Sequence, residues 1–428
     1  MTTGGTLAPP RRDLAGRLRR HTGSGRRYLP EVDGLRFLAI VPVLVSHLSE
    51  RVVRSIERDG ALSAAEQRLV DLIPTGDVGV YLFFVLSGFI IALPMSRQAA
   101  VDPDRAPNVG YRSYMRRRLT RLEPPYLVVL FGLFLGITAL DALGQGSVME
   151  GTNSFSKDSV SLGDSLAASV FYLHGLVFQA RPRINPPAWS LEIEFQFYVL
   201  APLLILVFVA IGRRFGRPGA SGLTRRLVAE AAGLVAIAVG LKAAVWLFVP
   251  DDLHEFLVVE YLPFFLVGFA ISRLYAEGLV ERIAGRAASV LFLVGVAASL
   301  YLNYFDQKDI HPTYETVRSI VLLGTLGSVF LGALAGGVGG RFTARKWISI
   351  VGGMCYSIYL LHLAMFQASV SLLWRVLPID SLVPALLVYY ALVVPPVLAA
   401  CAVFYVLVER PCMDPTWPNR LWARVTGR

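Results

Sequence analysis

Long apolar runs separated by short polar segments dominate the hydrophobic pattern of this chain. A helix needs about 20 mainly apolar residues to cross the hydrocarbon core of a bilayer, and ten runs approach that length. We expect membrane-spanning helices at residues 34–51, 78–95, 124–143, 188–211, 227–249, 257–271, 287–305, 317–336, 347–373 and 383–407. An eleventh run, 165–179, is shorter and contains His174.

Basic residues decide how these runs are counted. Arginine-rich segments lie before residue 34, at 96–121, 212–226, 273–286 and 341–346, and after residue 409. With ten spans all of these segments fall on one side of the membrane, which the positive-inside rule assigns to the cytoplasm. Counting 165–179 as a crossing would move Arg213 and Arg214 outside. We therefore interpret 165–179 as an external or re-entrant helix and place both termini in the cytoplasm.

The composition supports this all-α, polytopic membrane fold. The 428 residues are 54% hydrophobic and 17% charged, whereas soluble domains carry about 25% charged residues. The 41 Lys and Arg against 31 Asp and Glu give a net charge of +10, but they lie in short loops, so we expect no nucleic-acid partner. We predict a disordered basic cytoplasmic arm at 1–33, a transmembrane domain at 34–411 and a cytoplasmic tail at 412–428, in the cell's inner (plasma) membrane.

The first span carries two ionisable residues, Arg36 and His47, eleven positions apart. This spacing is three helical turns, so both side chains share one face about 16 Å apart along the axis. Ionisable groups inside a bilayer are expensive and are functional by default. Arg36 could instead extend to the membrane surface, and His47 could serve only as an interhelical hydrogen-bond donor. Pro42, between them, removes one backbone hydrogen bond.

Four arginines enter the third span from the cytoplasmic side: Arg116, Arg117, Arg118 and Arg121. They could simply enforce the topology. Alternatively, Arg118 and Arg121 lie on one helical face at positions i and i+3, where two guanidinium groups can grip phosphate or pyrophosphate. A nucleotide-bearing donor would arrive from this side.

Two carboxylates, Glu192 and Glu194, open the fourth span. They lie two residues apart and face different directions on a helix, so a shared acid pair is not expected. A glutamate that accepts a hydrogen bond from a histidine could orient it as a base. Ser87 and His362 also lie inside spans, where a packing or structural hydrogen-bonding role competes with a functional one. No cysteine or histidine cluster predicts a metal site.

Together these residues resemble the acyltransferase type 3 family of integral-membrane O-acyltransferases. The resemblance covers nearly the whole chain and rests on several matches in order. They are Arg36 with His47; residues 83–89; Arg118, Arg121, Pro124 and Tyr126; Trp189, Ser190, Leu191, Glu194, Phe197, Tyr198 and Pro202; residues 357–362; and residues 409–411. Tyr81 departs from the family, in which many members carry Asp.

The resemblance implies ten spans and selects Glu194 rather than Glu192. Bacterial members O-acetylate lipopolysaccharide, peptidoglycan and exopolysaccharide sugars, and some acylate macrolides, so the implied acceptor is a carbohydrate, a glycolipid or a macrolide. It also implies acyl-CoA, in particular acetyl-CoA, as co-substrate, with no permanently bound cofactor. Some relatives carry a fused SGNH-type hydrolase-like domain; a reaction needing one would take it from another protein.

The resulting hypothesis places the donor phosphates on Arg118 and Arg121, with Arg36 nearby. His47 acts as general base on the acceptor hydroxyl, oriented by Glu194, and an acyl-His47 intermediate stays open. The candidate substrate contacts are Ser87, Trp189, Ser190, Tyr198 and His362. The alternative is a transporter or flippase of a glycosylated or acylated lipid, whose intramembrane charges line its route.

Overall fold

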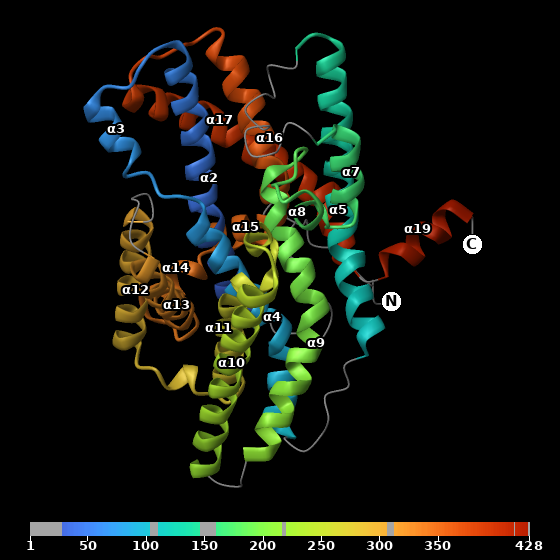
Figure 1. Cartoon of the computed structure of the whole chain (residues 1–428), viewed down its shortest axis with the longest axis vertical. Helices are drawn as coiled ribbons and strands as arrows, with labels where there is room; N and C mark the ends of the chain where they lie inside the picture. The colour runs from blue at the N-terminus through green and yellow to red at the C-terminus, as the bar shows by residue number, and fades with distance from the viewer. Residues whose placement is uncertain are drawn as a thin grey trace, which may run out of the picture.

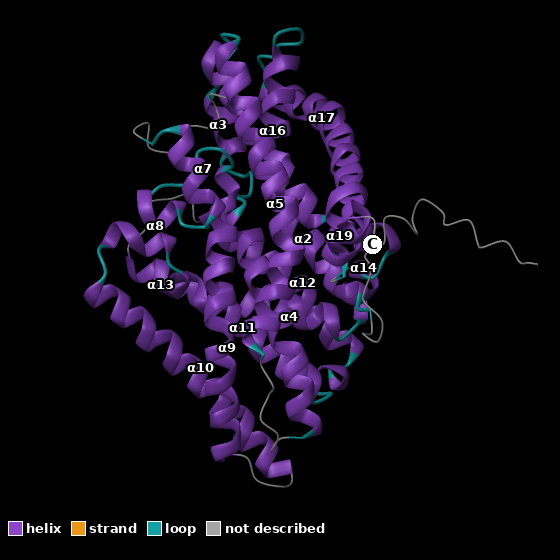
Figure 2. Ribbon diagram, turned by 90° about the vertical axis from the view of Figure 1, so that its right-hand side faces the viewer, coloured by secondary structure: helices purple, strands orange, loops and turns teal. Residues whose placement is uncertain are grey.

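The computed structural model describes residues 28–102, 110–145, 160–215, 220–305, 312–414 and 416–426. This described part contains helices and connecting segments and no strand (Figure 2). Most of the predicted basic arm, residues 1–27, lies outside it. Within it, ten helices are long and apolar enough to span a membrane, which confirms the expected fold class and the expected number of spans.

The elements that form the ten spans are α2 (Pro30–Asp59), α4 (Asp77–Val101), α5 (Tyr111–Ala142), α9 (Trp189–Phe215), α10 (Ala220–Phe248), α11 (Val258–Ala276), α12 (Gly285–Phe305), α13 (Pro312–Leu334), α16 (Cys355–Trp374) and α17 (Leu382–Phe404). Many of the long helices, such as α5, α9, α10 and α12, run roughly along the long axis of the molecule (Figure 1). The first helix begins at Pro30, four residues before the predicted start, because a proline suits the first turn of a helix.

Short elements connect the spans. They are α3 (Ala64–Val70), α7 (Leu162–Val170), α8 (His174–Phe178), α14 (Gly337–Thr343), α15 (Lys346–Gly353), α18 (Arg410–Cys412) and α19 (Trp417–Thr426), with single turns at Pro186–Ala188, Asp251–Phe256 and Val280–Arg282 and a wider turn at Tyr405–Glu409. The segment 165–179 forms the two short helices α7 and α8 rather than a crossing, consistent with ten spans. The predicted span 347–373 is divided at Met354 into α15 and α16.

α2 lies near the centre of the bundle and packs against α4, α15, α16 and α17. Small residues allow these close approaches, as is common between membrane helices. A methyl group at Gly79 would overlap the carbonyl oxygen of Ala39, and one at Gly352 would overlap that of Asp33. By contrast, α10 lies at the edge of the molecule (Figure 2) and exposes Val228, Val235 and Val239.

Two residues assigned to polar loops are buried instead. Arg273 is 1% exposed and Arg226 is 6% exposed. Glu230 accepts from both, at 2.8 Å from Arg226 Nε and 3.1 Å from Arg273 Nε, and Glu277 lies 2.7 Å from Arg273. The ion pair between Arg273 and Glu230 therefore joins α11 to α10, whereas Arg226 and Glu230 pair within α10. Both arginines thus have a structural role in addition to the topological one.

We expect Gly88→Ala to destabilise the fold. A methyl group at Gly88 would overlap the carbonyl oxygen of Phe265 in α11. Overpacking of this kind costs about 1–3 kcal/mol. The melting temperature of the purified protein in detergent is the measurement. Gly132→Ala in α5 is the matched control, since a methyl group there meets nothing within 4 Å; equal melting temperatures for the two variants would contradict the close packing of α4 on α11.

The half-buried carboxylate of Glu66 connects α3 to the start of α17. Glu66 Oε1 accepts from the Leu382 amide at 2.8 Å, and Oε2 accepts from the Ser63 amide at 3.0 Å and the Ser63 hydroxyl at 2.7 Å. The hydrogen bond from Leu382, followed by those from Ser63, lowers the pKa of Glu66 from 4.5 to about 2. A lowered folded-state pKa stabilises this connection above pH 4.5, and the contribution is lost as the pH falls toward 2.

We therefore expect the Leu382 amide to lose protection from hydrogen exchange as the pH falls from 4.5 to 2. Residue-resolved exchange, corrected for the intrinsic pH dependence, is the measurement. In Glu66→Gln the protection should be weaker at neutral pH and should not change over this range. A pH-dependent change of the same size in that variant would assign the effect to another group.

Candidate active site

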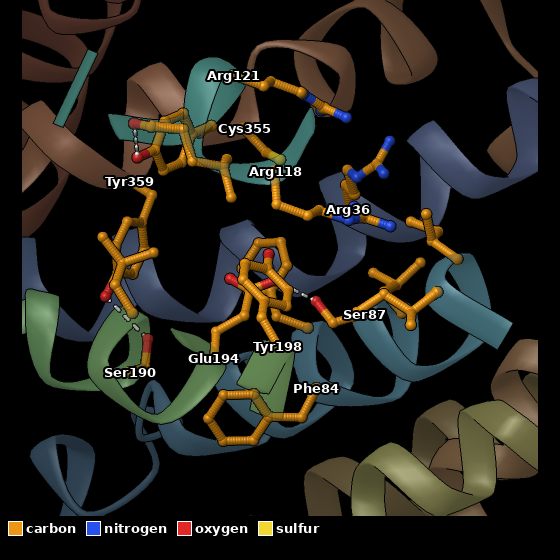
Figure 3. A pocket seen from close by; sticks show the side chains of 17 residues that line it. Arg36, Phe84, Ser87, Arg118, Arg121, Ser190, Glu194, Tyr198, Cys355 and Tyr359 are labelled. Atoms are coloured by element: carbon orange, nitrogen blue, oxygen red, sulfur yellow. Dashed lines mark hydrogen bonds between the residues drawn. The ribbon is translucent and has the colours of Figure 1, made fainter. Parts of the chain in front are cut away.

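Three arginines meet in one cavity within the bundle. Arg36 comes from α2, while Arg118 and Arg121 come from α5, and all three line a cavity with an empty volume of about 840 Å³. Figure 3 shows their side chains gathered on one side of it. Arg36 pairs with the buried Asp33. Arg118 and Arg121 have no carboxylate partner among the described residues, which leaves two cationic groups able to bind an anionic ligand.

The floor of this cationic cavity is built around Glu194 of α9. The hydroxyls of Ser87 and Tyr198 each donate to Glu194 Oε1 at 2.5 Å (Figure 3). The Arg118 guanidinium lies 5.6 Å from the centre of the Tyr198 ring. This network positions Glu194, Tyr198 and Arg118 relative to one another, so a carboxylate and a guanidinium lie on the same wall of the cavity.

His47 opens onto a second cavity. This second cavity has an empty volume of about 760 Å³, and Glu50, Asp77, Arg181 and Trp189 also line it. Glu50 pairs with Arg54 at 2.5 Å, and Arg181 lies 5.3 Å from the centre of the Trp189 ring. An imidazole beside a polar cavity can accept a proton from a hydroxyl bound there.

Tyr359 of α16 is the lining residue that the two cavities share. Its hydroxyl donates to the Pro187 carbonyl oxygen and lies 2.8 Å from the Ser190 hydroxyl. Figure 3 shows Tyr359 and Ser190 on the side of the cationic cavity opposite the three arginines. Arg36 and His47 thus share α2, as the spacing predicts, but they line different cavities with Tyr359 between them.

The structure corrects the predicted partner of His47. Glu194 accepts from the hydroxyls of Ser87 and Tyr198, and no hydrogen bond joins these two described residues, Glu194 and His47. His47 Nδ1 lies 2.8 Å from His362 Nε2 instead. The reason is geometric. Glu194 lies in the wall of the cationic cavity, while α16 packs directly on α2 and brings His362 next to His47.

The other predicted substrate contacts divide between the cavities. Ser87, Ser190 and Tyr198 line the cationic cavity and Trp189 lines the second. His362 is 0% exposed and lines neither, so its place does not suit a substrate contact. Glu192 is buried and accepts from the Gly175 amide at 2.8 Å, which holds α8 against α9.

Sequence reasoning missed several lining residues, among them Glu50, Asp77, Arg181 and Tyr359. Glu50 follows His47 by three positions and Tyr359 precedes His362 by three, and residues three apart share a helical face. This spacing could have identified both. Asp77 begins α4 and Arg181 lies in a connection, and neither shows a sequence signal for this place.

The fold and these cavities define a polytopic helical membrane protein with an internal cationic site beside an imidazole pair. The chain belongs to a family of acyltransferases, because the family model described as an acyltransferase domain matches residues 29–406.

Curated relatives of the chain are also named as acyltransferases. The chain is 26% identical over 190 residues to the putative peptidoglycan O-acetyltransferase YrhL of Bacillus subtilis (strain 168), covering 44% of this chain and 25% of that protein. It is 27% identical over 177 residues to the acyltransferase MdmB of Streptomyces mycarofaciens, covering 41% and 38%. It is 23% identical over 355 residues to the O-acetyltransferase OatA of Staphylococcus aureus (strain NCTC 8325 / PS 47), covering 78% and 50%.

The chain thus spans at most half the length of each of these relatives. No solved structure matches it significantly.

Proposed function

We propose that this protein is a membrane O-acyltransferase that moves an acyl group, in particular acetyl, from acyl-CoA to a hydroxyl of a carbohydrate, glycolipid or macrolide acceptor. The observation that carries the proposal is the pair of cavities: one lined by arginines, the other by His47, with Tyr359 as their common wall. The names of the relatives, two of which are O-acetyltransferases, support this class of reaction.

The donor would occupy the cationic cavity. Acyl-CoA carries phosphates at one end and a thioester at the other, and Arg118 and Arg121 lack carboxylate partners among the described residues, so they would bind the phosphates with Arg36. The arginine-rich loops favour the cytoplasmic side for this entrance. The pantetheine arm would extend toward Tyr359, and the thioester would have to pass this side chain to reach His47.

The acceptor would occupy the second cavity. His47 would take the proton of the acceptor hydroxyl as the oxygen attacks the thioester carbonyl. The carbon–sulfur bond then breaks, and the CoA thiolate leaves and takes the proton from the imidazolium. The products are an acylated acceptor and free CoA. Proton transfer of this kind typically contributes about 10²–10⁴-fold to the rate.

Glu194 would act on the donor side. Its contacts with Ser87 and Tyr198 support a role in shaping the cationic cavity, in place of the predicted orientation of His47.

The test is acyl transfer by the purified full chain in lipid nanodiscs. Acetyl-CoA is added with muropeptides, with an exopolysaccharide fragment or with a macrolide, and released CoA thiol and acceptor mass are measured. We expect thiol release that depends on one acceptor, together with a gain of one acetyl group on it. Movement of an acceptor across proteoliposomes without thioester consumption would favour the transporter alternative and contradict this proposal.

A further inference from the structure

His47 and His362 form a buried contact that the reaction scheme above does not use. Their rings lie nearly parallel, with centres 5.0 Å apart and planes inclined by 9°, and His47 Nδ1 is 2.8 Å from His362 Nε2. Two neutral imidazole nitrogens at this distance form one N–H···N hydrogen bond, in which one nitrogen donates and the other accepts. Which of them donates decides the tautomer of His47.

The backbone of α16 settles the direction. His362 Nδ1 lies 3.0 Å from the Ile358 carbonyl oxygen and 2.9 Å from the Tyr359 carbonyl oxygen. Carbonyl oxygens only accept hydrogen bonds, so His362 Nδ1 carries a hydrogen. In a neutral imidazole the other nitrogen then has the lone pair. His362 Nε2 is therefore the acceptor, and His47 Nδ1 is the donor.

We propose that His362 is a positioning residue that holds neutral His47 in its Nδ1–H tautomer and leaves His47 Nε2 as the nitrogen that accepts the proton. Nε2 has no hydrogen-bond partner among the described residues, and His47 lines the second cavity. The catalytic assignment of this nitrogen rests on the proposed function; the tautomer itself does not.

This arrangement also explains why a histidine suits position 362. When His47 gains a proton at Nε2, its Nδ1–H donates to His362 as a charge-assisted hydrogen bond, which is shorter and stronger than a neutral one. His362 is fully buried beside the rings of Tyr359 and Phe366, so its own orientation is fixed. It would thus serve as a neutral counterpart of the carboxylate that orients histidine in hydrolase triads.

The direct test is the tautomer of His47, read from solid-state nitrogen NMR of the full chain in proteoliposomes with ¹⁵N-labelled histidine. The chain has six histidines, and the spectrum of His47→Ala assigns the signals of His47. We expect Nδ1–H at His47 in the wild type, a different or mixed state in His362→Leu, and Nδ1–H again in His362→Gln, whose amide oxygen can accept from Nδ1.

Wild-type His47 with its hydrogen on Nε2, or an unchanged tautomer in His362→Leu, would overturn the proposal. The wild-type spectrum alone decides if the leucine variant does not fold. His254→Gln is the matched control, because His254 lies in the turn Asp251–Phe256, away from this pair, and its replacement should leave the His47 signals unchanged.

Turnover of acetyl-CoA supplies a second readout. Loss of a partner that orients a metal-bound imidazole costs about 10–100-fold. By analogy, His362→Leu should lower kcat by about this factor without changing the KM for acetyl-CoA. His362→Gln should recover most of it. A loss confined to KM, or equal losses in both variants, would contradict a positioning role. A wild type that shows the expected tautomer but no turnover would instead remove the proposed function.

Discussion

Replacing His47 with alanine should lower acyl transfer by about 10²–10⁴-fold, the range that general base catalysis contributes. His47 is the imidazole that lines the second cavity. Without it, no other imidazole among the described residues lining either cavity could take the hydroxyl proton. The rate of CoA release with acetyl-CoA and an acceptor is the measurement. Binding of acetyl-CoA should persist, because Arg36, Arg118 and Arg121 line the other cavity.

His254→Ala is the control for this substitution. His254 lies in the turn Asp251–Phe256 and lines neither cavity, so its replacement removes an imidazole of the same size away from the proposed site. We expect near wild-type turnover. Turnover by His47→Ala at the wild-type rate would remove the base from the scheme, while the donor site in the cationic cavity would stand.

Replacing Arg118 or Arg121 with alanine should weaken donor binding. A hydrogen bond to a charged group contributes about 1.5–3 kcal/mol, and since 1.4 kcal/mol corresponds to tenfold in affinity, each variant should raise the KM for acetyl-CoA by about 10–100-fold. The maximal rate should fall less, because His47 and the second cavity are untouched. Initial rates over a range of acetyl-CoA concentrations separate the two parameters.

The neighbouring Arg117 offers a matched control. It lies in the same helix but lines a different pocket with Arg112, Ser113, Arg116 and Thr120. Arg117→Ala removes the same charge from the same helix and should leave the KM for acetyl-CoA unchanged. Equal increases of KM in all three variants would mean that the overall positive charge attracts the donor, and that the cationic cavity holds no specific phosphate site.

The spans were predictable because the bilayer imposes a length. Each membrane helix needs about 20 mainly apolar residues, and the ten runs correspond to the ten candidate spans. Helix ends were less predictable. The division at Met354 follows Gly352, which lies directly against the Asp33 carbonyl of α2. Neither the division nor this contact has a periodic signal in the sequence.

The clustering of Arg36, Arg118 and Arg121 could also be predicted from the sequence. Charges inside or beside a membrane are costly unless they face a cavity or a partner, and a two-helix arginine cluster satisfies that condition. The same reasoning treated Arg226 and Arg273 as loop residues, yet both are buried against Glu230. Composition and spacing do not distinguish an arginine in solvent from one paired with a distant helix.

Residue order alone thus determined a ten-helix membrane fold and predicted an entrance lined by arginines and a functional histidine, because length, hydropathy and charge act locally along the chain. The partner of His47 required the packed bundle. Glu194 and His362 lie 147 and 315 residues from His47 in the sequence, and only the packing of α16 on α2 determines that the imidazole, and not the carboxylate, comes within hydrogen-bonding distance. The separation of the two cavities by Tyr359 has the same origin, since their walls are assembled from helices far apart in the chain.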